Sequence, residues 1–243
     1  MNTRFIGQRV LYYPRVTSTM DIAREEAERG AAPGTVIVAG EQTRGRGRLK
    51  RAWLSPRGNL ALSLILRPST AQLPSLVMLA SLAVVHTIEA ITGLEAEIKW
   101  PNDVLISGRK VGGILIESRV EAGRVDYAIL GIGLNVNLRP EDFPEILPTA
   151  TSLSREVGRE VSPLSLIPHL LTEIERLYLA LSQGESLYEE WRARLVTLGK
   201  RVRVHSADSV KEGIAEAVHR DGSLWLRLDD GSLRRVLAGD VTL

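Results

Sequence analysis

The chain has 243 residues, of which 44% are hydrophobic and 25% charged, a composition that predicts a globular protein with room for one large and one small domain. Its formal net charge of +2 gives no global reason to expect nucleic-acid binding, so any basic site must be local. The absence of cysteine excludes disulfides, a thiol nucleophile and cysteine-based zinc sites, and fits a cytoplasmic enzyme.

The first part of the chain carries strand and helix signals in turn. Strands are predicted at residues 9–13, 35–39, 60–66, 96–100, 111–119 and 125–132, and helices at 20–29, 74–92, 163–181 and 186–195. Hydroxyl residues precede the first helix and Gly30 ends it. The most apolar stretch, residues 73–91, contains His86 and Glu89 and therefore predicts a buried helix rather than a membrane span. Residues 138–162 are rich in Pro, Glu and Ser and predict a surface excursion.

The character of the chain changes from Gly199 onwards. Short alternating strands follow around residues 202–204, 213–218, 224–228 and 233–237. Asp221-Gly222 and Asp230-Gly231 are hairpin turn signals between them. The sequence therefore predicts two domains, residues 1–196 and a small β-barrel at residues 197–243.

Residues 45–53 read Gly-Arg-Gly-Arg-Leu-Lys-Arg-Ala-Trp. Glycines let the backbone approach a ligand closely, and the interleaved cationic side chains donate to phosphate or carboxylate oxygens. Such alternation also occurs in disordered segments that bind nucleic acid. Here the stretch forms a short loop between two predicted buried strands, which favours a specific anion site.

Other chemistries have weaker signals. There is no GxxxxGK[ST] phosphate loop, and residues 131–136 begin like a dinucleotide fingerprint but lack its third glycine and the helix that should follow. The four histidines show no metal-ligand spacing, so no protein metal site is predicted; they are His86, His169, His205 and His219.

Four motifs occur in a characteristic order: GRGRLKRAW at residues 45–53, KWPNDV at 99–104, KVGGILIE at 110–117 and GIGLNVN at 131–137. Together with the closing Gly239-Asp240-Val241 they resemble the biotin–protein ligase family over essentially the whole chain. The resemblance implies an α+β fold, with a catalytic domain like those of class II aminoacyl-tRNA synthetases and biotin synthetases (a mixed sheet with packed helices) and a small C-terminal β-barrel. It implies a ligase that uses MgATP to convert biotin to biotinoyl-5'-AMP and pyrophosphate, and then biotinylates one lysine of a biotin carboxyl carrier protein.

Residue roles follow from matching motif positions. The resemblance implies Arg48, Lys110 and Asp103 as catalytic residues, because two anions must be brought together and the developing charge stabilised. As biotin contacts it implies Ser18, Thr19, Gln42, Gly45, Arg46, Lys110, Gly113, Gly131 and Gly133. As ATP contacts it implies Arg48, Arg51, Trp53, Lys99, Asn102, Asp103 and Asn135. One departure is Met20, where the family usually has Asn after Ser-Thr.

Two other functions compete with this interpretation. A lipoate or octanoate ligase of the same superfamily would use a similar pocket, and a nucleic-acid-binding module would use the Gly/Arg loop with strongly salt-dependent affinity. The resemblance further implies a homodimer. Because the first predicted strand begins near residue 9, we expect no DNA-binding domain before it, and we expect neither DNA nor a membrane as a partner.

Overall fold

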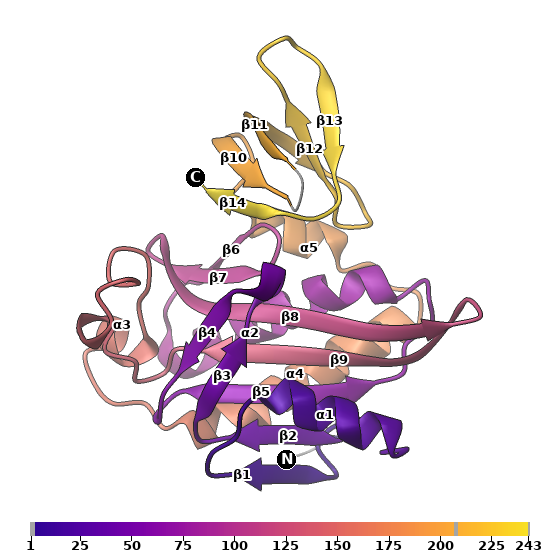
Figure 1. The fold of residues 1–243 in the computed structure, drawn as a ribbon, viewed down its shortest axis with the longest axis vertical. Coiled ribbons are helices and arrows are strands. Elements are labelled where there is room, and N and C mark those ends of the chain that lie inside the picture. Colours follow the sequence, from indigo (N-terminus) through magenta and orange to yellow (C-terminus); the bar gives the residue numbers. More distant parts are fainter. Residues whose placement is uncertain (1–2, 207–208, 243) are drawn as a thin grey trace.

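A computed structural model of the protein describes residues 3–206 and 209–242. Figure 1 shows a large body built on a seven-stranded sheet, with a small β domain standing on one end of it. The structure therefore confirms the predicted α+β catalytic domain followed by a small domain made of strands.

The large sheet is mixed. In spatial order its strands are β1 (Val10–Tyr13), β2 (Val36–Ala39), β5 (Leu60–Leu66), β9 (Arg124–Leu134), β8 (Arg109–Glu121), β7 (Asp103–Ile106) and β6 (Glu97–Lys99). β1 and β2 run parallel, and all the other neighbouring strands run antiparallel. Every residue of β5 is buried because the sheet is covered on both faces.

The strand β7 has no separate signal in the sequence, because four residues are too few to show a period. A tight turn at Ser107 and Gly108 connects it to β8. Ser107 and Gly108 both have positive φ, which is the geometry of a type I′ hairpin.

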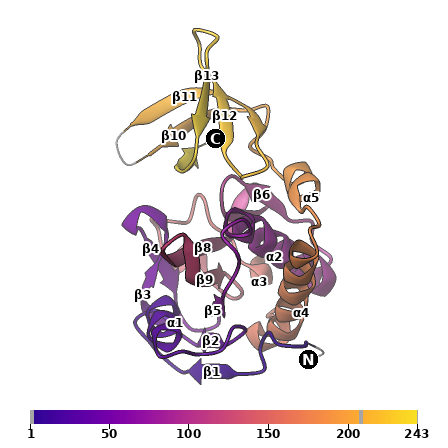
Figure 2. The ribbon, with the colours of Figure 1, turned by 90° about the vertical axis from the view of Figure 1, so that its right-hand side faces the viewer.

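Helices lie on both faces of the sheet, as Figure 2 shows. α1 (Thr19–Glu28) packs on one face, where Ala23 and Ala27 meet Ile37 and Ile65. On the other face lie α2 (Leu76–Thr92) and α4 (Pro163–Ser182), the two long helices predicted from the sequence. The short helices are α3 (Leu153–Val157) and α5 (Tyr188–Ala193), and the 3-10 turns are η1 (Arg48–Lys50), η2 (Leu73–Ser75) and η3 (Pro140–Asp142).

The segment Leu73–Thr92 is long and apolar enough to cross a membrane by composition. In the structure it is a core helix instead, because most of its side chains are buried between the sheet and α4. It ends at Gly93, which adopts the left-handed conformation of a helix C-cap. The sequence prediction of a buried helix is confirmed.

The glycine–arginine segment is not a plain loop. It forms a separate antiparallel hairpin of β3 (Gln42–Arg46) and β4 (Ala52–Ser55), with η1 at its tip, on the same side of the sheet as α1. A Cβ at Gly45 would lie 2.4 Å from the Trp53 carbonyl oxygen, so only glycine fits between the two strands. β3 contains a glycine and both strands are only four or five residues long, so neither has a clear signal in the sequence.

The C-terminal domain is one antiparallel sheet. Its strands are β10 (Arg201–His205), β11 (Val210–Val218), β12 (Leu224–Arg227), β13 (Leu233–Val236) and β14 (Asp240–Thr242), in the order β13-β12-β11-β10-β14. Within the described part of the chain no pairing joins β13 to β14, so the predicted barrel is a sheet with two open edges. Trp100 fixes this domain to the body, because its indole Nε1 donates to the Gly222 carbonyl at 2.8 Å.

Candidate active site

One cavity lies between the β3–β4 hairpin, the N-terminus of α1, the centre of the large sheet and the end of the C-terminal domain. It brings together most of the residues predicted from the motifs. These are Ser18, Thr19, Gln42, Arg46, Arg48, Arg51, Trp53, Lys99, Asn102, Asp103, Lys110, Gly113, Gly131 and Gly133. Segments far apart in the chain thus converge on one site.

Two predicted residues do not line this cavity. Gly45 pairs with Trp53 in the hairpin, and a Cβ there would lie 3.1 Å from Gln42 Nε2, so Gly45 contacts Gln42 and not the open cavity. Asn135, predicted to contact ATP, is buried at the end of β9, where its side-chain amide donates to the Thr151 carbonyl at 3.0 Å. The structure therefore gives Asn135 the role of holding the 138–162 excursion against the sheet.

One end of the cavity is charged, and Asp103 lies at its centre. The Asp103 carboxylate is 2.5 Å from Lys110 Nζ and 3.1 Å from Lys99 Nζ. Lys99 and Asp103 are partners across the β6–β7 hairpin, and β8 brings Lys110 in from the other side. Lys110 Nζ also lies 5.3 Å from the centroid of the Trp53 ring. Two ammonium groups and a carboxylate therefore share a position that an anionic substrate would enter.

Arg48 reaches the same end from the tip of the hairpin. Its guanidinium donates to Asn102 Oδ1 at 3.1 Å and to the Gly239 carbonyl at 3.3 Å. Burial lowers the pKa of Arg48, while the negative charges of Asp240 and Asp103 oppose that shift. Because the ordinary pKa of arginine is far above neutral, Arg48 is still a fixed positive charge at pH 7.

The C-terminal domain contributes Asp240, which the sequence analysis did not select. Its Oδ2 is 2.8 Å from Arg51 Nη1, yet the atom is buried without an aligned hydrogen bond. Asp240 lies in the last strand, next to the Gly239 carbonyl that receives Arg48. The closing Gly239-Asp240-Val241 is part of the family resemblance, but only the fold shows that Asp240 reaches the cavity.

The other end of the cavity has neutral hydrogen-bonding groups. Ser18 caps α1 by accepting from the Met20 amide at 3.3 Å. The Thr19 amide and hydroxyl both donate to Gln42 Oε1, at 2.9 and 3.1 Å. Arg46 also lies here, but its guanidinium is paired with carboxylates on α1 and β8. This end is therefore suited to a polar ligand group without net charge.

Glycines form the floor of the cavity. A Cβ at Gly133 would lie 2.4 Å from the Trp53 indole, and one at Gly131 would lie 2.5 Å from Met20 Sδ. Gly113 on β8 also packs against Trp53, with 3.3 Å between its built Cβ and the ring. Flat backbone is required here, because any side chain would displace the residues that close the cavity.

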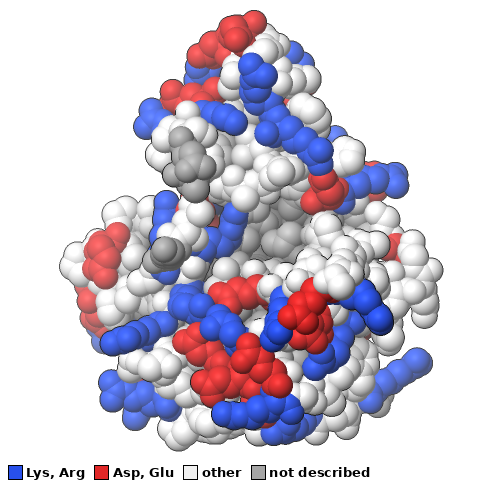
Figure 3. All heavy atoms as spheres, turned by 45° about the vertical axis from the view of Figure 1, so that its right-hand side comes forward, with Lys and Arg blue, Asp and Glu red and all other residues white. Residues whose placement is uncertain are grey.

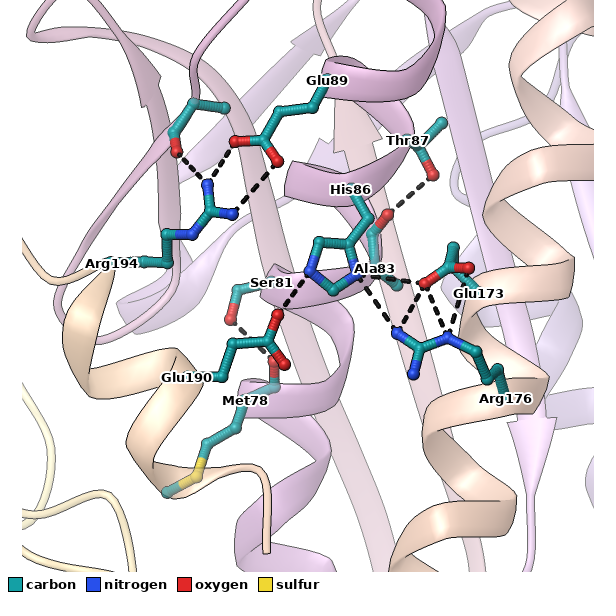
Figure 4. Close-up of polar contacts among 11 residues, drawn as sticks. Met78, Ser81, Ala83, His86, Thr87, Glu89, Glu173, Arg176, Glu190 and Arg194 are labelled. Atoms are coloured by element: carbon teal, nitrogen blue, oxygen red, sulfur yellow. Dashed lines mark hydrogen bonds and ion pairs between the residues drawn. The ribbon is translucent and has the colours of Figure 1, made fainter.

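Away from the cavity, His86 has a structural role. Figure 4 shows it between two carboxylates, with Glu173 Oε2 3.0 Å from Nδ1 and Glu190 Oε1 2.7 Å from Nε2. These contacts join α2 to α4 and α5. Across residues 3–206 and 209–242, no group of three His, Cys, Asp or Glu side chains has metal-binding geometry.

Comparison with known proteins gives two family matches. Residues 12–135 match the biotin/lipoate A/B protein ligase family, and residues 197–243 match the biotin protein ligase C-terminal domain. The bifunctional ligase/repressor BirA of Bacillus subtilis is 37% identical, and the match covers 100% of this chain and 76% of that protein. The biotin–[acetyl-CoA-carboxylase] ligase of Mycobacterium tuberculosis is 35% identical over 93% of this chain and 85% of its own length.

A solved structure agrees with the sequence matches. Biotin protein ligase from Aquifex aeolicus in complex with biotin and ATP has a TM-score of 0.80 and 29% identity, covering 97% of this chain and 98% of that one. The similarity extends through both domains. By its sequence, its fold and this shared architecture, the chain belongs to the biotin/lipoate A/B protein ligase family.

Proposed function

We propose that the protein is a biotin–protein ligase, which forms biotinoyl-5'-AMP from biotin and MgATP and then transfers biotin to a lysine of a biotin carboxyl carrier protein. The observation that carries the proposal is the division of the cavity into a cationic end and a neutral polar end. Biotin has the same division, with a carboxylate on one end and an uncharged ureido ring on the other. The relative from Mycobacterium tuberculosis, named as a biotin–[acetyl-CoA-carboxylase] ligase, supports the same activity.

In the first step, a carboxylate oxygen of biotin attacks the α-phosphorus of ATP, and the bond to pyrophosphate breaks. Two anions must approach each other, so fixed positive charge is needed where they meet. Arg48 and Lys110 lie at this end, from the hairpin tip and from β8. Lys110 exchanges Asp103 for the reacting oxygens, and Arg51 exchanges Asp240 for the triphosphate.

Magnesium enters with the nucleotide as part of the substrate. Mg²⁺ in such sites takes one or two protein carboxylates besides phosphate oxygens and water. Asp103 and Asp240 fit that need, since both line the cavity and Oδ2 of Asp240 is buried without an aligned hydrogen bond. The ion supplies charge neutralisation for the phosphates.

In the second step, the neutral amine of an acceptor lysine attacks the carbonyl carbon of biotinoyl-5'-AMP, and AMP leaves. The incoming lysine must lose a proton, and Asp103 is the carboxylate placed to orient the amine and accept it. Lys99 remains paired with Asp103, 3.1 Å away, and holds it in position.

We further propose a homodimer that pairs through an edge of the large sheet. β1 is an edge strand, and its Val10 and Tyr12 are 44% and 58% exposed. A cytoplasmic location, without DNA or membrane as partners, completes the proposal. The face in Figure 3 mixes acidic and basic side chains without a continuous basic surface, which supports the absence of DNA as a partner.

The test is pyrophosphate release from MgATP with biotin, lipoate or octanoate, without any acceptor protein. Release with biotin alone supports the proposal. Release with lipoate or octanoate instead would reassign the substrate, with Met20 as the residue to examine first, because it lines the neutral end of the cavity. No release with any of the three would contradict the adenylation step itself.

A further inference from the structure

Ser63 is a hydroxyl in the middle of the most buried strand of the protein. It lies in β5, whose sequence is LALSLIL, and it is 0% exposed. Its neighbours across the sheet are Ile37 on β2 and Gly131 on β9. A buried hydroxyl destabilises a fold unless it forms a hydrogen bond, so the partner of Ser63 indicates its role.

The Ser63 hydroxyl donates to Thr19 Oγ1 at 2.8 Å. Thr19 has one hydroxyl proton, which it donates to Gln42 Oε1 at 3.1 Å. The Thr19 backbone amide donates to the same oxygen at 2.9 Å. Because an amide N–H can only donate, these contacts determine which atom of the Gln42 side chain is the oxygen. The donors therefore point in one direction along this chain of hydrogen bonds, from Ser63 through Thr19 to Gln42; we call the chain the relay.

The relay decides what Gln42 offers a ligand. With Oε1 occupied by two donors, the NH₂ group faces away from Thr19 and lies 3.1 Å from the position that a Cβ on Gly45 would take. Gln42 and Thr19 both line the neutral end of the cavity, whereas Ser63 lies beneath it. The complement of a fixed N–H donor is an acceptor on the ligand, and the ureido carbonyl of biotin is such an acceptor.

We infer that Ser63 is a positioning residue for biotin, which acts through Thr19 to hold the Gln42 amide with its N–H donors toward the ureido ring. The inference rests on the proposed function, since it names the ring that the neutral end receives. Ser63 does not touch the ligand. Its hydroxyl removes the freedom of Gln42 to rotate, so less of the binding free energy is lost in ordering the site.

Another buried serine shows what a purely structural hydroxyl does in this fold. Ser81 is also 0% exposed, but its hydroxyl donates to the Val77 carbonyl of its own helix at 2.8 Å. Its hydrogen bond therefore stays within α2 and holds no other side chain in place. Ser63 instead donates to a side chain of the cavity that lies 44 residues away in sequence.

The experiment compares Ser63→Ala with Ser81→Ala in the full chain. The readouts are kcat for pyrophosphate release and the KM values of biotin, ATP and 2-iminobiotin, in which a guanidine replaces the ureido carbonyl. Ser63→Ala should raise the KM of biotin about two- to tenfold, the effect of one hydrogen bond, and leave kcat and the KM of ATP unchanged. The preference for biotin over 2-iminobiotin should fall by the same factor, because Gln42 no longer selects an acceptor.

Ser81→Ala is the matched control, since it removes the same atom from an equally buried site and should change none of these values. An unchanged KM for biotin and an unchanged preference in Ser63→Ala would overturn the inference. So would a loss of kcat with both KM values raised together, which a general structural defect would produce. If the unmodified protein releases no pyrophosphate with biotin, the proposed function fails first, and the inference fails with it.

Discussion

The two ends of the cavity are held in opposite ways. At the charged end, Asp103 is shared by Lys99 and Lys110, and Asp240 faces Arg51, so these three cations already have a carboxylate partner. At the neutral end, buried hydrogen bonds hold Thr19 and Gln42 to the floor of the sheet. In contact with water, an ion pair can be exchanged for substrate oxygens at little cost in free energy. A buried chain of hydroxyl hydrogen bonds, in contrast, cannot be rearranged without leaving polar groups unpaired.

This difference matches the two tasks of the site. Phosphates and a carboxylate enter and leave in every turnover, and temporary carboxylate partners keep the cations in place between turnovers. The ring of biotin, in contrast, stays in one position during both chemical steps. A rigid neutral end therefore provides selectivity, and an exchangeable charged end provides catalysis.

The sharpest test of the charged end is Lys110→Ala. We expect kcat for pyrophosphate release to fall about 10²–10³-fold, the usual effect of removing one group that stabilises developing charge. The KM of biotin should change much less, because the neutral end is intact. Lys211→Ala, which removes a lysine from β11 outside the cavity, is the control. Equal effects of the two variants on kcat would refute the role of Lys110.

Arg51→Ala tests whether the triphosphate takes the place of Asp240. The KM of ATP should rise about ten- to a hundredfold, since a hydrogen bond to a charged group contributes about 1.5–3 kcal/mol, while the KM of biotin stays the same. Arg57→Ala is the matched control, because Arg57 follows the same hairpin but pairs with Glu41 outside the cavity. A rise in the KM of biotin with an unchanged KM of ATP would contradict the prediction, because Arg51 would then contact biotin and not the triphosphate.

Ionic strength should separate the two ends without any mutation. From about 0.05 to about 0.5 M KCl, screening should raise the KM of ATP several-fold. Biotinol, the alcohol analogue of biotin, uses only the neutral end, so its Kd by calorimetry should stay constant over the same range. A biotinol Kd that rises in parallel with the KM of ATP would contradict the prediction, because both ends of the cavity would then bind through charge.

The sequence predicted residues at both ends of the cavity, but not the residue beneath the neutral end. Arg48, Arg51, Asp103 and Lys110 stand in dense motifs whose residue types already indicate anion chemistry. Ser63, in contrast, is one hydroxyl among six apolar residues of β5. Nothing in that pattern shows that its partner lies on α1, because the contact depends on how helix and sheet pack.

The fold shows the same limit. Long periodic elements such as α2 and α4 were predictable, because burial of one or both faces leaves a clear pattern. The short strands β3, β4 and β7 were not, since their pairing depends on tertiary contacts rather than on propensity. Asn135 shows a related limit: its motif position predicts an ATP contact, whereas in the structure its amide donates to the Thr151 carbonyl outside the cavity.

A buried charge outside the cavity also stabilises the fold. The buried carboxylate of Glu175 on α4 accepts the amides of Arg4, Phe5 and Ile6 at 2.6, 2.8 and 2.9 Å. Burial alone would raise the pKa of Glu175, but these hydrogen bonds outweigh it and lower the pKa below its usual value of 4.5. The stabilisation is therefore complete above about pH 4.5 and is lost as the pH falls through the folded-state pKa.

Glu175→Gln should lower the free energy of unfolding by about 1–3 kcal/mol at pH 7, since a neutral amide accepts fewer of these hydrogen bonds and more weakly. Calorimetric Tm values measured at decreasing pH should show the wild-type advantage shrinking below about pH 4.5. Glu185→Gln makes the same charge change at an exposed position just beyond α4 and should leave Tm nearly unaltered. Activity at pH 7 should be unchanged, because the cavity lies elsewhere. A Tm difference between Glu175→Gln and the wild type that does not change with pH would contradict this prediction. Packing and not charge would then hold the N-terminal segment.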